Sequence, residues 1–468
     1  MKKTLFIIIL LASSFIINCK NKNKPGLSLS DLEEIVDTSS LSLKKKNNAV
    51  LLFKDDSCLK HYHLSEKRNI TAEKPIKIDL TSIHDTKEFV LSDLGNKLEY
   101  IKLEHPDSNY FTTGSTKIIL TQKYIITHNI LGISIFDLQG KFIDNIVKNE
   151  VQIFRSGREG IGFAMNDFKG AFSAPSVYEN NLLYVIEESE TKQKSLVNYN
   201  LNKVYKDKNN EKIQNTFKGD IISERAGSFS SGIIKYFYLN KNILFGFNSF
   251  WTTIELNELF YSFNNTGDTL CTFKNYDSVP SFKKQAYRVT ESTDVYYFNS
   301  ELIYRQAYND TIFKITGKNE LVPKYILERG NKRVTTLEGM NPDSDLTGKI
   351  IINQISETDK WLILVTSNNH VSPNNRKKSN LNFNYWFYNK KDGLCYNRNG
   401  KFENEQIGLR NDINNGLSFW PNIVSNEGYL ISCQPVKYLL EDYGKEKLSV
   451  LLPFNQFNNN QLIITILK

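Results

Sequence analysis

Three observations predict an all-β fold built from small sheets. Aromatic and β-branched residues, which favour strands, are abundant, and the 468 residues include 29 Phe and 24 Tyr. From residue 76 onward, short apolar runs alternate with turns rich in Asn, Asp, Gly and Lys. Groups of three or four runs recur at spacings of about 40–60 residues, as in propeller blades with loop insertions. Together they predict a six-bladed β-propeller with a short N-terminal extension and one C-terminal helix.

Each recurring unit is a small sheet with two apolar faces that it cannot bury alone. Arranging such units around an axis covers each face with the neighbouring sheet. The strands expected in these units are residues 117–120, 124–127, 132–136, 141–143, 182–186, 195–199, 243–247, 259–263, 270–273, 302–305, 311–315, 324–327, 361–365, 384–388 and 428–432. A pair of β-sandwiches is the alternative, but no clear linker interrupts the series of runs.

The two ends of the chain are expected to complete the ring. Residues 98–101 and 461–466 are strand-like, and their pairing would remove an open sheet edge. Between them, residues 435–447 place apolar side chains at helical spacing, with Pro435 suited to the first turn. We interpret this segment as a helix that packs on the ring, with a partner-binding helix as the alternative.

The N-terminus is typical of a bacterial lipoprotein signal. Lys2 and Lys3 precede an apolar run over residues 5–17, which ends just before Cys19 and a polar stretch. The run is too short for a membrane span, which needs about 20 residues. We therefore expect the Cys19 thiol to carry a lipid. A secretory signal peptide with an incidental cysteine is the alternative.

These features divide the chain into four parts. Residues 1–18 are the expected signal peptide, 19–30 a polar tether, 31–75 an N-terminal extension and 76–468 the propeller. The extension contains a possible short helix start near Ser30 and a possible strand pair within residues 48–72.

The remaining cysteines are far apart in the sequence and contain no CxxC pair. They are Cys58, Cys271, Cys395 and Cys433. An oxidising compartment would permit disulfides in any of three pairings, and buried free thiols are an equal or better interpretation. A zinc site is not indicated, since its usual ligand spacing is missing.

The net charge of +8 is spread along the chain. The short basic runs at 44–46 and 376–378 are typical of solvated loops, and we expect no nucleic-acid partner.

Several segments resemble a known family. They are residues 89–94, 98–104, 135–142, 308–315, 321–325, 410–413 and 419–421, with Leu467 and Lys468 at the end. In order and spacing they are similar to six-bladed β-propeller lipoproteins of Gram-negative bacteria, which are largely uncharacterised. The resemblance covers residues 76–468 and implies a lipid-anchored protein of the outer membrane. It supplies no catalytic residues.

The sequence departs from that family in two places. The family often has a Gly-x-Gly-Pro-Gly-Glu run after the first blade, and residues 157–163 lack its proline. Residues 27–75 are additional. A shared ligand is therefore not implied. The basic, amide-rich residues after Cys19 favour the periplasmic face of the membrane over the cell surface.

Few residues indicate chemistry. His61 and His63 would share one face of a strand, as at the start of a metal site, but no third ligand is close in sequence. The acidic pairs are Asp55–Asp56, Glu187–Glu188 and Asp343 with Asp345. Closeness in sequence does not establish the carboxylate separation that glycoside hydrolysis needs, and Asp343 with Asp345 lacks the full pattern of a calcium loop. Motifs for a hydrolase elbow and a P-loop are missing from the sequence.

Aromatic residues are densest at 384–388 and 419–421. Such rings can stack on sugars or anchor peptides, but we favour a role in the cores between blades.

The sequence thus favours a lipid-anchored binding or scaffold module of the cell envelope, for a peptide, a glycan or an envelope protein. The alternative is an envelope hydrolase or lyase with its site at the propeller channel. A sensor that works with a membrane receptor is a third class. We expect no metal, cofactor or catalytic residue.

Overall fold

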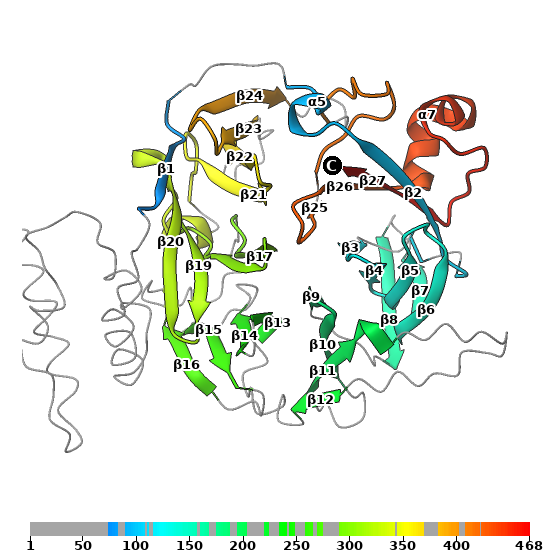
Figure 1. Cartoon of the computed structure of the whole chain (residues 1–468), viewed down its shortest axis with the longest axis horizontal. Helices are drawn as coiled ribbons and strands as arrows, with labels where there is room; N and C mark the ends of the chain where they lie inside the picture. The colour runs from blue at the N-terminus through cyan, green and yellow to red at the C-terminus, as the bar shows by residue number, and fades with distance from the viewer. Residues whose placement is uncertain are drawn as a thin grey trace, which may run out of the picture.

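The computed structural model describes residues 74–82, 89–107, 110–111, 116–156, 160–167, 175–187, 194–203, 220–223, 234–240, 243–248, 258–264, 269–274, 290–341, 344–368, 382–401, 408–421 and 423–468. In these residues, six sheets of four or five strands surround a common centre (Figure 1). The predicted six-bladed propeller is confirmed.

Blades 1 to 3 are four-stranded antiparallel meanders. Their strands are β3 (Lys117–Leu120), β4 (Tyr124–Asn129), β5 (Gly132–Asp137) and β6 (Phe142–Lys148) in blade 1, β9 (Ser176–Tyr178), β10 (Asn181–Glu187), β11 (Lys194–Asn200) and β12 (Asp220–Ser223) in blade 2, and β13 (Ile234–Asn240), β14 (Ile243–Asn248), β15 (Glu258–Phe263) and β16 (Thr269–Lys274) in blade 3.

Blades 4 and 6 each gain a strand from the N-terminal part of the chain, β1 (Ile76–Asp79) and β2 (Leu98–Glu104) respectively. The other strands are β17 (Asp294–Phe298), β18 (Glu301–Arg305), β19 (Thr311–Gly317) and β20 (Glu320–Glu328) in blade 4, β21 (Ile351–Glu357), β22 (Trp361–Asn368), β23 (Asn382–Asn389) and β24 (Cys395–Lys401) in blade 5, and β25 (Ile423–Val424), β26 (Leu430–Pro435) and β27 (Gln461–Leu467) in blade 6.

The hydrophobic core lies between the blades. Separate clusters of buried apolar side chains fill the junctions of blades 1 and 2, 3 and 4, 4 and 5, 5 and 6, and 6 and 1. Within blade 5, the side chains of β22 alternate: Leu362 and Leu364 pack toward blade 4, and Ile363 packs toward blade 6. Blades 1, 4, 5 and 6 therefore bury apolar side chains on both of their faces.

Strands from both ends of the chain complete blade 6. β2 pairs antiparallel with β27, with Leu98 opposite Leu467 and Glu104 opposite Gln461. β27 pairs on its other side with β26. The predicted closure is confirmed, and it joins residues separated by almost the whole described chain.

The helix α7 (Val436–Leu451) confirms the predicted C-terminal helix and extends beyond its expected end. Pro435 caps it, and the helix changes direction at Gly444. Val436, Leu439 and Leu448 pack against Ile463 of β27. The helix therefore covers one face of blade 6, as the packing interpretation predicted. No helix among the described residues is long and apolar enough to cross a membrane.

Four short elements complete the described structure, and none of them was predicted. They are α5 (Leu91–Leu94), α6 (Thr336–Met340), η1 (Leu201–Lys203) and η3 (Gly330–Lys332).

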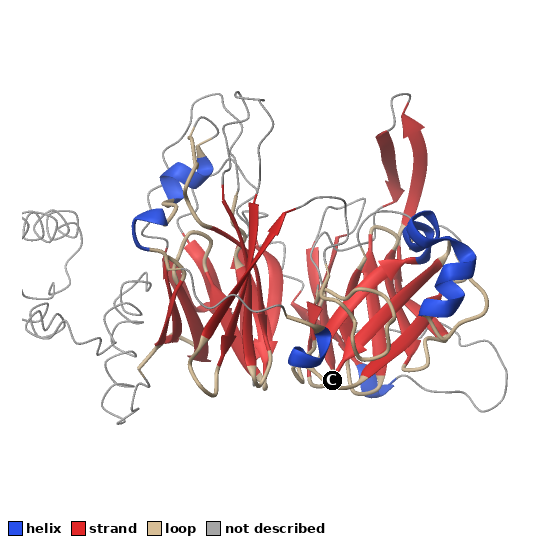
Figure 2. Ribbon diagram, turned by 90° about the horizontal axis from the view of Figure 1, so that it is seen from above, coloured by secondary structure: helices blue, strands red, loops and turns tan. Residues whose placement is uncertain are grey.

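A hairpin formed by β7 (Glu150–Ser156) and β8 (Gly160–Asp167) is a separate two-stranded sheet. It stands clear of the ring on the side of blade 1 (Figure 2). Within the run at 157–163, where this sequence departs from the family, residues 160–163 begin β8. Residues 157–159 themselves lie outside the described residues.

The sequence did not reveal the innermost strands β9, β13, β17, β21 and β25. Figure 1 shows them around the centre of the ring. β25 has only two residues, and β21 carries the polar residues Asn353 and Gln354. β9 and β25 are too short, and β21 is too polar, to form the apolar runs by which the other strands were recognised. β13 and β17 are apolar and aromatic, and the prediction missed them. The expected helix start and strand pair in residues 30–72 lie outside the described residues.

The closure supports a prediction about stability. Ile464 in β27 is 1% exposed and packs at the junction of blades 6 and 1. We expect Ile464→Ala to lower the free energy of unfolding by about 2–5 kcal/mol, because it leaves a cavity in a packed core. Val450→Ala, at a residue 85% exposed on α7, should change it by no more than about 0.5 kcal/mol. Denaturant unfolding of both variants measures the difference, and equal effects would contradict the closed ring.

Candidate functional site

Most of the candidate residues from the sequence lie outside the described part of the chain. These are Cys19, Asp55, Asp56, Cys58, His61, His63, Glu188 and Asp343. Cys19 as the lipid carrier therefore stays a prediction.

Two of the acidic candidates, Glu187 and Asp345, lie among the described residues. Glu187 is the last residue of β10. Asp345 accepts hydrogen bonds from the N–H of Thr347 at 2.9 Å and from its hydroxyl at 2.6 Å, and so shapes its own turn. Among the described residues, no three His, Cys, Asp or Glu side chains are grouped as metal ligands would be.

The aromatic candidates belong to the core, as the sequence favoured. Tyr385 and Phe387 pack toward blade 6, and Trp386 and Tyr388 pack toward blade 4. Trp420 contacts Tyr385, with ring centroids 4.7 Å apart. These rings join blades and are not presented to a ligand.

Three cysteines lie among the described residues. Cys395 and Cys433 are free thiols, and Cys271 is buried, with 2% of its surface exposed. Burial raises the pKa of the Cys395 and Cys433 thiols to about 12, which makes both poor nucleophiles near neutral pH.

Ser134 and His105 meet at the junction of blades 6 and 1, in the manner of a nucleophile and its base. Ser134 Oγ lies 3.2 Å from His105 Nε2. However, His105 Nδ1 accepts a hydrogen bond from the Asp107 N–H, so the proton of the neutral ring is on Nε2. Burial lowers the pKa of His105, which favours that neutral form. Ser134 donates its proton to Asn145 Oδ1 at 2.7 Å. The ring therefore has no free lone pair for the serine proton.

A buried ionic cluster joins blade 4 to blade 5. The Glu291 carboxylate contacts Arg305 at 2.9 Å and also Arg329, and all three side chains are 0% exposed. Glu291 also accepts a hydrogen bond from the Ile352 N–H in blade 5 at 3.2 Å. Burial acts to raise the pKa of Glu291, but the two arginines outweigh it and hold that pKa below its ordinary value. The carboxylate is therefore charged and fixed.

A second ionic cluster lies at the same junction. The Glu357 carboxylate, 0% exposed, contacts Lys390 at 2.7 Å and Lys324 at 2.9 Å. The hydroxyls of Tyr325 and Tyr296 donate to it at 2.8 Å and 3.1 Å. Burial lowers the pKa of Lys390, although Glu357 opposes that shift. Groups of this kind can perform acid–base chemistry, but here the carboxylate is buried and paired with both lysines, whose side chains are 15% (Lys390) and 22% (Lys324) exposed.

One end of the ring's centre is spanned by turns. Asn426 of blade 6 donates through its side chain to the Val177 carbonyl of blade 2 at 3.2 Å. The Asn426 carbonyl accepts from the N–H of Asn299 in blade 4 at 3.3 Å. Because these blades are not neighbours in the ring, the contacts reach across its centre. They restrict access to the channel from that end.

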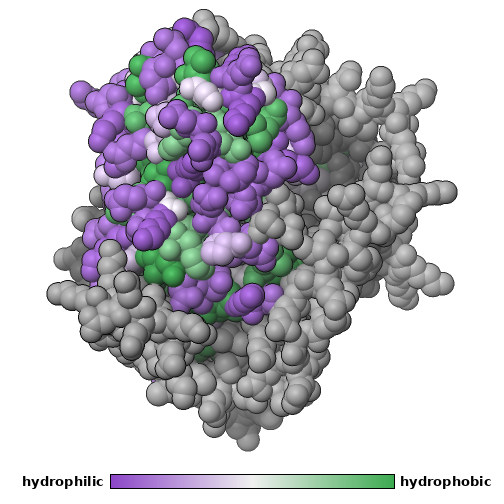
Figure 3. All heavy atoms as spheres, turned by 90° about the vertical axis from the view of Figure 1, so that its right-hand side faces the viewer, coloured by the Kyte–Doolittle hydropathy of each residue, from purple (hydrophilic) through white to green (hydrophobic). Residues whose placement is uncertain are grey.

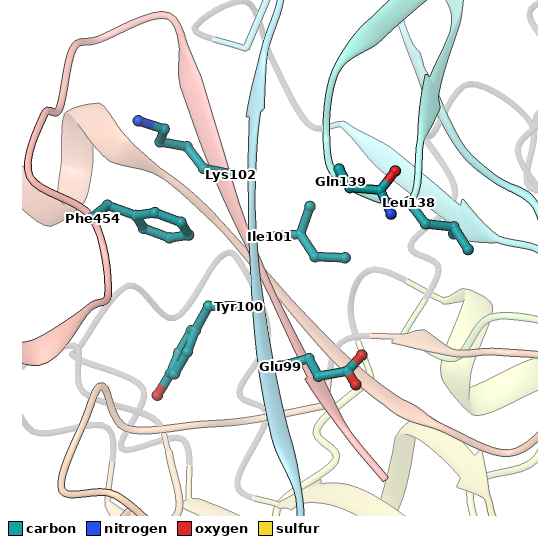
Figure 4. Close-up of a pocket in the computed structure, with 7 residues that line it drawn as sticks. All are labelled: Glu99, Tyr100, Ile101, Lys102, Leu138, Gln139 and Phe454. Atoms are coloured by element: carbon teal, nitrogen blue, oxygen red, sulfur yellow. The ribbon is translucent and has the colours of Figure 1, made fainter.

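An accessible hollow of about 420 Å³ lies on the outer side of blade 6. Three segments far apart in the sequence line it: β2, the turn between β5 and β6, and the loop after α7. The lining residues are Glu99, Tyr100, Ile101, Lys102, Leu138, Gln139 and Phe454. Figure 4 shows Tyr100, Lys102 and Phe454 on one side of β2, with Ile101, Leu138 and Gln139 on the other.

The local sequence explains the β5–β6 wall of the hollow. Asp137 Oδ1 accepts hydrogen bonds from the N–H of Gln139 at 3.0 Å and of Lys141 at 2.8 Å, which forms a tight turn. Gly140 has φ +86°, and a Cβ there would lie 2.4 Å from the Lys102 carbonyl oxygen. Glycine thus lets the turn approach β2 closely.

The charges at the hollow are held by neighbouring groups. Glu99 contacts both Lys97 and Lys468 at 2.7 Å, and hydrogen bonds from Lys468 and Lys97 lower the pKa of its carboxyl. Lys102 Nζ donates to the Gln456 carbonyl at 3.1 Å and lies 5.4 Å from the Phe454 ring centroid. The hollow is therefore apolar at its walls, with its charges paired.

The side of the molecule that carries β2, β6 and α7 is mostly hydrophilic, with small hydrophobic patches between polar side chains (Figure 3).

The family model for a domain of unknown function, DUF4933, matches residues 61–443. The chain belongs to the DUF4933 family. The match covers β1 to β26 and part of α7, and leaves out β27 of blade 6. A search of curated proteins finds no match.

Solved structures show only distant likenesses. A member of the DUF4221 family from Bacteroides vulgatus is 13% identical, over 80% of this chain and 99% of that one, with a TM-score of 0.37. The WD40 domain of Neurospora crassa Pan2 is 9% identical, over 80% and 96%, with a TM-score of 0.35. PorZ of Porphyromonas gingivalis, a surface component of the type-IX secretion system, is 10% identical, over 70% and 44%, with a TM-score of 0.26. Such low scores support no conclusion about function, and the propeller assignment rests on strand pairing.

The sequence did not predict the hollow or the buried clusters. The residues that line the hollow come together only when β2 joins blade 6. Glu291, Arg305 and His105 are ordinary residue types whose neighbours are far away in sequence. The one available signal was the strand-like pattern of residues 98–104, which indicated pairing but not an accessible edge.

The Glu291 cluster makes a testable contribution to stability. Glu291→Gln would leave two buried arginines without their shared carboxylate, and we expect a loss of about 3–5 kcal/mol in the free energy of unfolding. The control is Glu328→Gln, which removes a surface pair with Lys77 at 2.7 Å whose side chains are 41% and 53% exposed. That change should be below about 1 kcal/mol. Chemical denaturation compares the two, and a small loss for Glu291→Gln would show that the cluster does not lock the blades.

Proposed function

We propose that this chain is a lipid-anchored binding or scaffold propeller of the bacterial outer membrane, facing the periplasm. It would hold a protein, peptide or glycan of the cell envelope. Propellers are commonly protein-binding or scaffold modules, although fold alone does not determine function.

The N-terminal pattern supports the anchor. The basic start, the short apolar run and Cys19 are followed by polar residues that suit a flexible tether. The resemblance to propeller lipoproteins of Gram-negative bacteria points the same way. The basic residues after Cys19 favour the periplasmic face.

The observation that supports binding most directly is the contrast between buried and accessible groups. The side chains of Glu291 and Glu357, which could serve catalysis, are 0% exposed and saturated by partners. The accessible hollow at β2 has apolar walls and paired charges. A substrate would not reach the Glu291 and Glu357 carboxylates, whereas a partner can contact the hollow. This arrangement favours a binding module over a hydrolase or lyase acting at the channel.

The test combines fractionation with crosslinking in cells. The wild-type chain should appear in the membrane fraction, and a reversible crosslinker should capture a reproducible partner there. Cys19→Ala removes the expected lipid carrier, so the protein should move to the soluble fraction.

The control is Cys433→Ala, which alters a buried thiol and should leave the protein in the membrane fraction. Cys19→Ala protein that stays in the membrane would contradict the lipid anchor. A wild-type protein that captures no partner, and instead turns over a glycoside or ester substrate, would contradict the binding function.

A further inference from the structure

The outer edge of β2 carries main-chain groups that no described strand pairs with. β2 is the last strand of its sheet. Lys97 and Lys468 exchange both backbone hydrogen bonds, at 2.9 Å and 3.3 Å. In an antiparallel pair, such bonded positions alternate with non-bonded ones. The N–H and C=O groups of Leu98 and Tyr100 therefore point away from β27, toward the outside.

Only the far end of this edge is covered. Gly140 lies against the Lys102 carbonyl, and Lys141 forms a parallel bridge with Glu104. The turn from blade 1 thus continues the sheet at one end of β2. No described residue continues the sheet beside Leu98 and Tyr100.

The charged side chains of β2 are bound to other groups and do not protect its outer edge. Charged side chains, above all Lys, normally discourage pairing with another strand. Here Lys102 is bound to the Gln456 carbonyl, and Glu99 is held between Lys97 and Lys468. The backbone of the edge is left accessible.

The walls of the hollow suit an added strand. Successive side chains of an extended peptide point to opposite sides. One set would meet Tyr100 and Phe454, and the other would meet Ile101 and Leu138, which lie across β2 from them (Figure 4). An extended chain is the ligand that can use both the free backbone groups and the two apolar walls.

The protein already contains one strand that is added to the outer edge of a blade. β1 adds to the outer edge of β20 as a parallel fifth strand, with Ile76 opposite Tyr325 and Asp79 opposite Glu328. The outer edge of a blade is therefore competent to accept a further strand.

A sugar is the weaker occupant. Sugars are held by stacking on free aromatic faces. The Phe454 ring has the Lys102 ammonium above it, and the Tyr100 hydroxyl is engaged by Asn411 and Asn414. The aromatic groups are occupied, whereas the backbone groups of the edge are open.

We propose that the outer edge of β2 binds an extended, largely apolar peptide segment of a partner protein by strand addition. This inference specifies the site and ligand class of the binding function proposed above, and rests on it.

The test uses residues 20–468, which omit the expected signal peptide and the lipid-carrying Cys19, and a displayed library of random twelve-residue peptides as the probe. Enriched peptides should protect the outward amides of Leu98 and Tyr100 from hydrogen exchange. Tyr100→Pro removes an outward N–H that the β27 pairing does not use, and should weaken binding by about tenfold or more. Leu138→Ala, which trims a wall, should weaken binding by about three- to tenfold.

The matched control is Leu394→Ala, at an apolar residue 53% exposed on the turn between β23 and β24. It should change affinity by less than about twofold. If Tyr100→Pro does not fold, Leu138→Ala and the exchange pattern of the wild type still decide the question.

Peptides that bind but protect another segment would overturn this inference and leave the proposed binding function standing. Failure of every peptide to enrich would also overturn it, while the crosslinking experiment decides the broader function separately. Oligosaccharides that protect the Leu98 and Tyr100 amides in place of peptides would show that the hollow is a sugar site.

Discussion

The structure depends on one constraint: the sixth sheet is completed only when the two ends of the chain pair. Each blade has two apolar faces that only neighbouring blades can cover. β2 and β27 supply the outer half of blade 6, and the cores on both sides of that blade use their side chains. Leu103 and Ile464 pack toward blade 1, and Leu467 packs toward blade 5. Without this pairing, blades 5 and 1 would each expose an apolar face.

The same constraint creates the candidate site. Because β2 is the last strand of its sheet, its inner edge holds the ring closed and its outer edge is available. In contrast to this accessible edge, the Glu291 and Glu357 carboxylates are buried at the junction of blades 4 and 5 and are paired with fixed cations. Such pairs are weak contributors to net stability but are damaging to break, which suits a role in fixing how blades 4 and 5 meet. The buried carboxylates thus lie between blades 4 and 5, whereas the outer edge of β2 is accessible.

The sequence predicted the strands that a local apolar pattern specifies. It did not predict the features that form only when residues far apart in the sequence come into contact. Residues 361–365 and 384–388 are strands buried on both faces, so their apolar runs were evident. β21 and β25 face the centre of the ring and are polar or very short, so they gave no such signal. The pairing of residues 98–101 with 461–466 was predicted because both ends were strand-like. The hollow was not, since Tyr100, Leu138 and Phe454 become neighbours only after closure.

Ring closure is tested most directly by a disulfide across β2 and β27. Tyr100 and Thr465 are opposite each other at a non-bonded position, where Cα atoms lie about 4.5 Å apart, within disulfide range. Tyr100→Cys with Thr465→Cys should form this bond quantitatively on mild oxidation, as read by peptide mass mapping. Tyr100→Cys with Ile463→Cys is offset by two residues, about 7–8 Å, and should stay reduced. Reduced thiols in the first variant, or equal oxidation of both, would contradict the closed ring.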